Sequence, residues 1–493
     1  MARINREYLW LGLLFAATLA LHLALSAQVS TLDSESYFVL RQADHIRHTG
    51  LPLFSDPLSY SGRVYLFQPL FHYLVAFFSF FTQAAVAGKI VQALCASAMV
   101  IIVYLIARHL TKNRTIAFIS GMFAGFIPAA YTGLASLSPT SLSLALAFLL
   151  IYLFLRIEEE GMASFAIIVA VLSLLTSASL FILLFGILFY FIILGLEKMK
   201  PSTREGELAT FLFFLAFWFD VLIYKKSFFY SGISTLWSNL PPALIENYFR
   251  NLSFLDILYS AGIVPLFLGV YGVYYVMFES KNRSTMLFVG IALSSFMALW
   301  LRLVPVEVGL AFLSTSVIIL SSHTMKASLA AASKMRIKNM GIMIYSAIIL
   351  LFIITTVPAL IGLAGQPEPQ SQDDINALLW LKENTNESAV VLGRVREGFM
   401  ISYFAERKNV ADPNFLFLKE PDQTFSDVEG LYRLHLLSEA VRLLNKHSVN
   451  YVFFSTKTKK EYSINTLPYF TTQCFDKVYD RNATIYLFED CKI

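Results

Sequence analysis

The feature that most constrains the fold of this chain is a series of long apolar segments that recurs as far as residue 363. Most of them are about 17–25 residues long, the length that a helix needs to cross the hydrocarbon core of a bilayer. Of all residues, 57% are hydrophobic and only 15% are charged, whereas a soluble chain has about a quarter charged residues. The chain is therefore predicted to be a polytopic α-helical membrane protein.

The apolar segments and the basic residues between them predict how the chain crosses the membrane. Eleven spans are expected, over residues 8–29, 84–107, 115–132, 139–156, 163–178, 179–196, 208–224, 254–278, 285–301, 303–322 and 340–363. With the amino end inside, the Lys and Arg residues of the connecting segments fall on the inner side, as the positive-inside rule requires. Counting residues 66–82 as a further span would break this pattern, so that segment is predicted to be an interfacial or re-entrant helix.

This orientation divides the chain into two parts. Residues 1–365 form the membrane part, whose first outer loop covers residues 30–83, and residues 366–493 form a soluble α/β domain on the outer face. We therefore expect an integral plasma-membrane protein with a cytoplasmic amino end and an extracytoplasmic C-terminal domain. A cleaved signal peptide over residues 1–27 is the competing interpretation, which is disfavoured because the apolar run is long for one.

The C-terminal domain shows alternating helix and strand patterns. Helices are predicted over 371–383 and near 426–446, and strands over 389–392 and 449–454. The segment from Cys474 to Cys491 is predicted to be a β-hairpin that turns around residues 480–482. Its two cysteines would face each other and form a disulfide in an oxidising outer compartment. Two unrelated reduced thiols are the alternative.

Acidic residues gather in the first outer loop, next to the membrane surface. The loop contains Asp33, Glu35, Asp44 and Asp56, together with His45, His48 and His72. Carboxylates at such a place can hold a divalent cation, or one can act as a general base on an acceptor hydroxyl. A solvated charged loop is the other interpretation. The chain has no zinc-like Cys/His spacing, no phosphate-binding glycine loop after a strand and no basic-aromatic pattern typical of nucleic-acid binding.

Five stretches of the chain match, in the same order, segments of one known family. Residues 35–41 read Glu-Ser-Tyr-Phe-Val-Leu-Arg and resemble an Asp-Pro-Tyr-Phe-x-x-Arg element. Residues 54–63 are similar to a Trp-Phe-Asp…Tyr-Pro-x-Gly-Arg stretch, and residues 67–70 stand in the place of Tyr-Pro-Gly. Residues 380–385 and 475–480 are similar to outer-domain segments. The chain thus resembles the catalytic subunits of oligosaccharyltransferases, which are membrane enzymes of the type C glycosyltransferase fold.

Other positions depart from that family. The resemblance places the family's metal-binding aspartate on Glu35, whereas Asp33 stands where the related protein O-mannosyltransferases and lipid A aminoarabinose transferases carry theirs, so either acid can be functional. The second outer loop, where the family has Asp-x-Asp, reads Ala-Ser-Leu-Ser-Pro-Thr over 135–140. The Trp-Trp-Asp-Tyr-Gly motif that recognises an Asn-x-Ser/Thr acceptor is replaced by Gly-Arg-Val-Arg-Glu-Gly at 393–398. The glutamate of the large outer loop has no clear counterpart in residues 234–239.

One basic residue matches the family. Arg302 resembles the arginine of its Ala-Arg-Phe element, which lies at the outer end of a span and contacts the phosphate of the lipid-linked donor. A guanidinium can bind a phosphate through two parallel hydrogen bonds. An arginine that merely reaches from the bilayer to the interface is the other interpretation.

The resemblance implies a glycosyltransferase that takes a sugar from a polyprenyl-phosphate or diphosphate donor and passes it to a glycan, lipid or protein acceptor on the outer face. Asp33 or Glu35 would act as the base or hold a divalent cation, Mg²⁺ or Mn²⁺, and Arg302 would neutralise the departing phosphate. Membrane lipids are expected partners and nucleic acid is not. The alternative is a non-catalytic relative that serves as a membrane scaffold or partner subunit. A transporter is disfavoured, because no span core carries paired buried charges.

Overall fold

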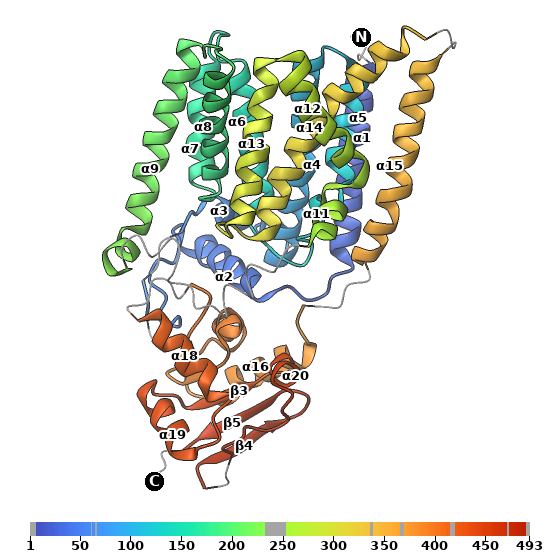
Figure 1. The fold of residues 1–493 in the computed structure, drawn as a ribbon. Helices are drawn as coiled ribbons and strands as arrows, with labels where there is room; N and C mark the ends of the chain where they lie inside the picture. The colour runs from blue at the N-terminus through green and yellow to red at the C-terminus, as the bar shows by residue number, and fades with distance from the viewer. Residues whose placement is uncertain are drawn as a thin grey trace.

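The structure, a computed structural model, describes residues 6–60, 62–64, 67–231, 253–335, 339–364, 369–414, 420–470 and 473–489. Figure 1 shows a layer of long, roughly parallel helices and, below it, a smaller part that contains a β-sheet. The short helix α2 (Ser34–Thr49) of the first outer loop lies between the two. The first outer loop thus lies where the helical layer meets the sheet-containing part.

The helical layer agrees with the predicted set of spans. Among the described residues, seven helices are long and apolar enough to cross a membrane: α1 (Arg6–Ala27), α4 (Ala84–Thr111), α9 (Thr203–Ser231), α12 (Ile263–Tyr274) with its π-helical continuation to Ser280, α13 (Arg283–Trp300), α14 (Val306–Ala332) and α15 (Met340–Ala364). Four shorter apolar helices stand among them: α5 (Arg114–Phe126), α6 (Thr140–Leu155), α7 (Met162–Leu174) and α8 (Leu180–Leu196). Together they match the eleven predicted segments, and the polytopic helical fold is confirmed.

Two segments near the outer surface differ from simple spans. The predicted continuous helix over 254–278 is wrong, because α11 (Phe254–Ala261) and α12 are separated at Gly262. That glycine has a φ of 77°, a conformation that only a residue without a Cβ adopts without strain. The segment 66–82 contains the helix α3 (Leu70–Phe78), whose nine residues are too few to cross a bilayer. It was predicted not to be a full span.

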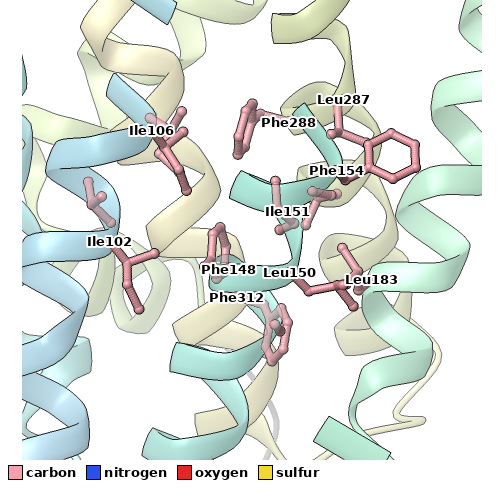
Figure 2. Close-up of a cluster of buried hydrophobic side chains, with 14 of the residues drawn as sticks. Ile102, Ile106, Phe148, Leu150, Ile151, Phe154, Leu183, Leu287, Phe288 and Phe312 are labelled. Carbon is pink, nitrogen blue, oxygen red and sulfur yellow. The ribbon is translucent and has the colours of Figure 1, made fainter. Parts of the chain in front are cut away.

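A buried apolar core joins the central helices of the membrane part (Figure 2). It contains side chains of α4, α6, α8, α13 and α14, including Ile102, Ile106, Phe148, Ile151, Leu183, Phe288 and Phe312. Glycines bring α8 and α13 into direct backbone contact, since a Cβ added at Gly290 would lie 2.5 Å from the carbonyl oxygen of Gly186. Close packing of small residues is a main source of helix association in lipid. The core therefore holds these helices in fixed positions relative to one another.

The outer part is built around a five-stranded sheet with the strand order β2-β1-β3-β5-β4. The strands are β1 (Val390–Leu392), β2 (Lys408–Asn409), β3 (Tyr451–Phe454), β4 (Phe475–Asp480) and β5 (Thr484–Phe488). Strand β1 runs parallel to β2 and β3, and β5 runs antiparallel to β3 and β4. The predicted hairpin with a turn at 480–482 is confirmed, and so are the two predicted strands.

Four longer helices accompany the sheet: α16 (Gln372–Asn384), α18 (Pro421–Leu431), α19 (Leu437–Lys446) and α20 (Thr456–Tyr462). The single helix predicted near 426–446 is wrong, since α18 and α19 are separate. Tyr432, at the end of α18, is fully buried and its hydroxyl donates a hydrogen bond to the Phe453 carbonyl, 3.1 Å away. Anchoring Tyr432 to the sheet fixes the chain at the end of α18.

The cysteines are in two different states. Cys95, within α4, is a free thiol. Cys474, just before β4, is disulfide-bonded. Its predicted partner, Cys491, lies outside the described residues, so the pairing itself stays a prediction.

The first outer loop is attached to the outer part by one buried ion pair and by a hydrogen bond from an arginine that is itself paired within the loop. Arg41 of α2 forms two hydrogen bonds of 2.7 Å with Asp56 and donates a third to the Ser402 carbonyl. Arg63 pairs with Asp412 of the outer part, and both side chains are at most 5% exposed. Breaking one partner of such a pair leaves an uncompensated charge in the interior. The loop and the outer part are thus held in one arrangement.

Backbone contacts and apolar side chains reinforce this attachment. Asn409 of β2 donates its N–H to the Leu58 carbonyl at 2.9 Å, so that the loop covers the edge of the sheet. One apolar cluster includes Tyr37 and Phe71 of the loop together with Leu378 and Phe453 of the outer part. The division at residue 365 into two domains stays a prediction, since the two parts share this cluster.

We expect Arg63→Ala to lower the stability of the protein by about 3–5 kcal/mol, because it leaves the Asp412 carboxylate buried without its cation. Arg47→Ala is the matched control: its pair with Asp44 spans 3.7 Å and both side chains are about one third exposed, so a loss of only ~0–1 kcal/mol is expected. Thermal unfolding of the purified variants in detergent measures both. Equal shifts for the two variants would contradict the role of the buried pair.

Thiol titration tests the predicted pairing of Cys474 with Cys491. The unfolded, unreduced protein should have one reactive thiol, that of Cys95, and the Cys95→Ser variant should have none. In the chain-entropy model, closing a loop of this size contributes ~3 kcal/mol, so reduction should also lower the unfolding temperature. Three reactive thiols in the unreduced protein would show that the pairing is wrong.

Candidate active site

Asp33 caps the amino end of α2. Its backbone is extended, with φ −68° and ψ 165°, and its Oδ1 accepts a hydrogen bond from the Ser36 amide at 2.9 Å. The Ser36 hydroxyl donates to the same oxygen. Asp is among the preferred residues at this position because its carboxylate pairs with otherwise unsatisfied helix amides. Among the described residues, Oδ2 of the half-exposed Asp33 makes no hydrogen bond, so one oxygen remains open.

The second outer loop lies directly against this helix end. The Asp33 amide donates to the Ala135 carbonyl at 2.9 Å. The Leu137 amide donates to the hydroxyl of the fully buried Ser36 at 2.7 Å. The two loops that the resemblance assigns to the site are therefore adjacent. The second loop contributes backbone groups and hydroxyls at this place, and residues 135–140 contain no carboxylate.

The segment that replaces the acceptor-recognition motif reaches the same helix end. Residues 393–398 include the short 3₁₀ helix η4 (Val395–Glu397), and the Arg396 carbonyl accepts a hydrogen bond from the Ser34 hydroxyl of α2. Two charged side chains of this segment form contacts inside the outer part. Arg394 pairs with Glu461, and the buried Glu397 accepts hydrogen bonds from the Ser455 and Thr458 hydroxyls. Arg396 is half-buried.

The rest of the 35–41 motif packs against the outer part. The Tyr37 ring lies 5.5 Å from the ring of Tyr403 and 4.7 Å from that of Phe404. Burial, with a contribution from the Asp33 charge, raises the pKa of Tyr37 to about 12. Its phenol stays protonated and does not act as a base at neutral pH. In this chain the Tyr and Arg of the motif thus position α2.

The remaining acidic and histidine residues of the loop are placed differently. Glu35 is exposed in the first turn of α2. Asp56 belongs to the Arg41 pair, and Asp44 lies near Arg47. His72 packs among aromatic rings, and burial lowers its pKa to about 3. Asp33 is the loop acid whose residue bonds directly to the second outer loop.

Arg302 lies just past the carboxyl end of α13. It has a φ of 54°, and the hydrogen bonds from its own amide to Leu299 and from the Leu303 amide to Ala298 close the turn after the helix. Such a left-handed residue commonly ends a helix. The side chain is exposed. Its role at a donor phosphate stays a prediction.

A cavity that the sequence patterns did not indicate lies beneath the second outer loop. Its volume is about 50 Å³. Its lining includes Gln92 of α4, Ser138 and Thr140 at the start of α6, and Glu307 in the first turn of α14. Gln92 also donates to the Gly133 carbonyl at 2.9 Å. No sequence motif surrounds Glu307, because its neighbours in the cavity come from distant parts of the chain.

The divalent cation implied by the resemblance does not fit the described residues. Among them, no group of three His, Cys, Asp or Glu side chains could hold a metal ion. The segment that carries the second pair of ligands in the family supplies only hydroxyls and backbone groups here. The stretch 234–239, where the family has a further glutamate, lies outside the described residues.

Comparison with known proteins identifies the fold. A family model described as dolichyl-phosphate-mannose-protein mannosyltransferase matches residues 68–224. No curated protein matches the chain significantly. Among solved structures, the oligosaccharyltransferase AglB from Archaeoglobus fulgidus, in complex with an inhibitory peptide and a dolichol-phosphate, is similar with a TM-score of 0.68 and 13% identity, over 91% of this chain and 70% of that chain. The chain has the type C membrane glycosyltransferase fold.

Two further structures have the same fold. ArnT from Cupriavidus metallidurans, bound to undecaprenyl phosphate, matches with a TM-score of 0.58 and 10% identity over 97% of both chains. The Archaeoglobus oligosaccharyltransferase in complex with Zn and sulfate matches with a TM-score of 0.65 and 14% identity, over 90% of this chain and 68% of that one. The predicted fold class, a type C membrane protein with a C-terminal outer domain, is confirmed.

The structure changes what a substitution of Asp33 tests, because this acid is a helix cap and not merely an exposed loop residue. We expect Asp33→Ala to lower stability by about 1 kcal/mol, while Asp33→Asn, which caps equally well, leaves it nearly unchanged. Thermal unfolding of both variants in detergent measures the difference. If Asp33→Asn were as destabilising as Asp33→Ala, the charge rather than the cap would be what α2 requires.

Proposed function

We propose that this protein is a membrane glycosyltransferase that moves a sugar from a polyprenyl-phosphate-linked donor to an acceptor on the outer face of the membrane. The observation that carries the proposal is the meeting of three segments at the amino end of α2: the cap residue Asp33, the second outer loop, and residues 393–398. These are the segments to which the resemblance assigns catalysis and acceptor recognition. Two solved proteins with this fold bind dolichol-phosphate and undecaprenyl phosphate.

Asp33 acts as the general base in this mechanism. Its open carboxylate oxygen takes the proton of the acceptor hydroxyl, and the acceptor oxygen attacks the anomeric carbon of the donor sugar. The bond between that carbon and the phosphate oxygen breaks, and the electron pair leaves with the carrier phosphate. Arg302 neutralises the charge that develops on this phosphate. Glu35, exposed two residues further along the chain in the first turn of α2, is the alternative base.

The acceptor differs from the Asn-x-Ser/Thr peptides of the oligosaccharyltransferases. The segment 393–398 lacks the aromatic and acidic residues of their recognition motif, and its Arg394 and Glu397 serve interior contacts. Sites built to bind a substrate hydroxyl owe much of their selectivity to such polar groups. A glycan, lipid or protein acceptor without that peptide motif is the corresponding proposal.

Substitution of the two acids and of Arg302 tests the mechanism. Asp33→Asn should reduce sugar transfer by about 10²–10⁴-fold without loss of folded protein, as removal of a general base does, and Glu35→Gln should do so if Glu35 is the base instead. Arg302→Ala should weaken use of the donor more than Arg302→Lys, which keeps the charge but not the fork of donors. The measurement is release of carrier phosphate from a panel of polyprenyl-phosphate sugars.

The outcome also separates the enzyme from a non-catalytic scaffold. Wild-type turnover in the Asp33→Asn/Glu35→Gln double variant would eliminate the proposed base. No turnover by the wild-type protein with any donor of the panel would favour the scaffold. Arg47→Ala, on the same helix but away from its amino end, should keep full activity.

We further propose that the amino end is cytoplasmic and that the first outer loop and the C-terminal part face outward. In a Cys95→Ser background, cysteines placed at positions 61 and 430 should react with an impermeant thiol reagent in intact cells, whereas Lys334→Cys should react only after permeabilisation. The positive-inside distribution of Lys and Arg is the physical reason. Protection of position 61 or 430 in intact cells would reverse the orientation and place the site on the inner face.

A further inference from the structure

The cavity beneath the second outer loop is lined by apolar residues and by several polar side chains. Its polar side chains are Gln92, Thr132, Ser138, Thr140, Ser141, Glu307 and Thr315. Three cavity residues of α14, Glu307, Ala311 and Thr315, follow one another at intervals of four, so one face of this helix forms a wall. A volume of about 50 Å³ has room for a few water molecules. Hydroxyls of a bound sugar can take the places of such waters.

Glu307 is the one charged residue in this lining. Its side chain is exposed. It shares the cavity lining with Ser138 of the second outer loop, and the Ala135 carbonyl of that loop accepts a hydrogen bond from the Asp33 amide, so the two acids lie near the same loop although 274 positions separate them in the chain. Like charges repel, so two neighbouring carboxylates are unfavourable for the fold. The first turn of a helix favours an acid by only about 0.3–1 kcal/mol, and any acid in that turn has this benefit. The helix therefore does not explain why a carboxylate lines the cavity beside Asp33.

A ligand with several hydroxyl donors does explain it. A carboxylate oxygen accepts hydrogen bonds from hydroxyl groups, and hydrogen bonds to charged groups are stronger than neutral ones. The amide of Gln92 and the hydroxyls of Ser138 and Thr140 supply both donors and acceptors around the same space. This combination suits a polyhydroxylated ring, and it does not suit an anionic phosphate, which Glu307 would repel.

We propose that this cavity receives the sugar of the lipid-linked donor and that Glu307 positions it by accepting hydrogen bonds from its hydroxyls. The inference rests on the proposed function and adds the place at which the donor sugar is recognised. The turn between α13 and α14 supports it, since Arg302 and Glu307 are only five residues apart. In the donor the phosphate and the sugar are directly bonded, so a cation just past α13 and a carboxylate in the first turn of α14 match its two neighbouring groups.

Binding measurements with purified protein test the inference without relying on turnover. The probes are bare undecaprenyl phosphate and the same carrier linked to mannose, glucose, galactose or N-acetylglucosamine. At least one sugar-bearing carrier should bind the wild-type protein more tightly than the bare carrier. Glu307→Ala should lower the affinity for that sugar-bearing carrier by about 10- to 100-fold and leave the affinity for the bare carrier unchanged. Glu307→Gln, which keeps one acceptor oxygen, should lower the affinity for the sugar-bearing carrier less.

Glu439→Ala is the matched control, because Glu439 also stands in the first turn of a helix, α19, in the outer part. It should change neither affinity. Equal weakening of bare and sugar-bearing carriers by Glu307→Ala would overturn the inference, as would a panel in which no sugar adds to the affinity of the bare carrier. Stabilisation of the wild-type protein by Mn²⁺ alone, lost in Glu307→Ala, would identify a cation site instead.

The inference and the proposed function fail in different ways. If sugar-dependent binding requires Glu307 but no donor is ever turned over, the sugar site stands and the glycosyltransferase proposal falls. If turnover is observed and depends on Asp33, while Glu307→Ala changes neither the KM for the donor nor kcat, the glycosyltransferase proposal stands and the sugar site falls. A rise in KM for the donor with a nearly unchanged kcat is the expected result.

Discussion

The hydrogen bonds at the amino end of α2 are the interaction on which the proposed site depends. The Asp33 carboxylate accepts a hydrogen bond from the Ser36 amide. The Asp33 amide and the Ser36 hydroxyl bond to the second outer loop, while the Ser34 hydroxyl bonds to the outer part. Further along the helix, Tyr37 and Arg41 attach the same element to the outer part. One helix end therefore fixes three chain segments that are far apart in sequence. A change in the tilt of α2 would move residues 393–398 away from the second outer loop.

Asp33 combines a structural and a proposed chemical role, and the geometry shows how both are possible. Capping uses Oδ1, and the other oxygen stays open among the described residues. Fixing one oxygen orients the whole carboxylate, so the second oxygen has a defined direction before a substrate arrives. Such preorganisation by supporting hydrogen bonds is what a catalytic group requires. A cap alone would be served as well by Asn, Ser or Thr, which is why the activity of Asp33→Asn decides between the two roles.

The helical layer was predictable from the sequence because span length and hydropathy are local properties. Asp33, Glu35 and Arg302 became candidate site residues because short motifs surround them. Contacts over long sequence separations were not predictable. The Arg63–Asp412 pair joins residues 349 positions apart. Arg63 ends one of the stretches that match the family, but nothing in the sequence indicates that Asp412 is its partner. Glu307 was missed for the same reason, since what distinguishes it is its neighbour Asp33. The break at Gly262 was missed because an apolar segment has the same hydropathy pattern whether it forms one helix or two.

The charges proposed for the site stand where the helices themselves favour them. Asp33 and Glu307 lie at the amino ends of α2 and α14, and Arg302 follows the carboxyl end of α13. Helix dipoles stabilise acids at amino ends and cations at carboxyl ends. This partly offsets the cost of holding two neighbouring acids at the membrane surface without a carboxylate-rich metal centre. In this arrangement the carboxylate nearest the second outer loop on the cavity side comes from α14, and its proposed partner is a sugar hydroxyl and not a metal ion.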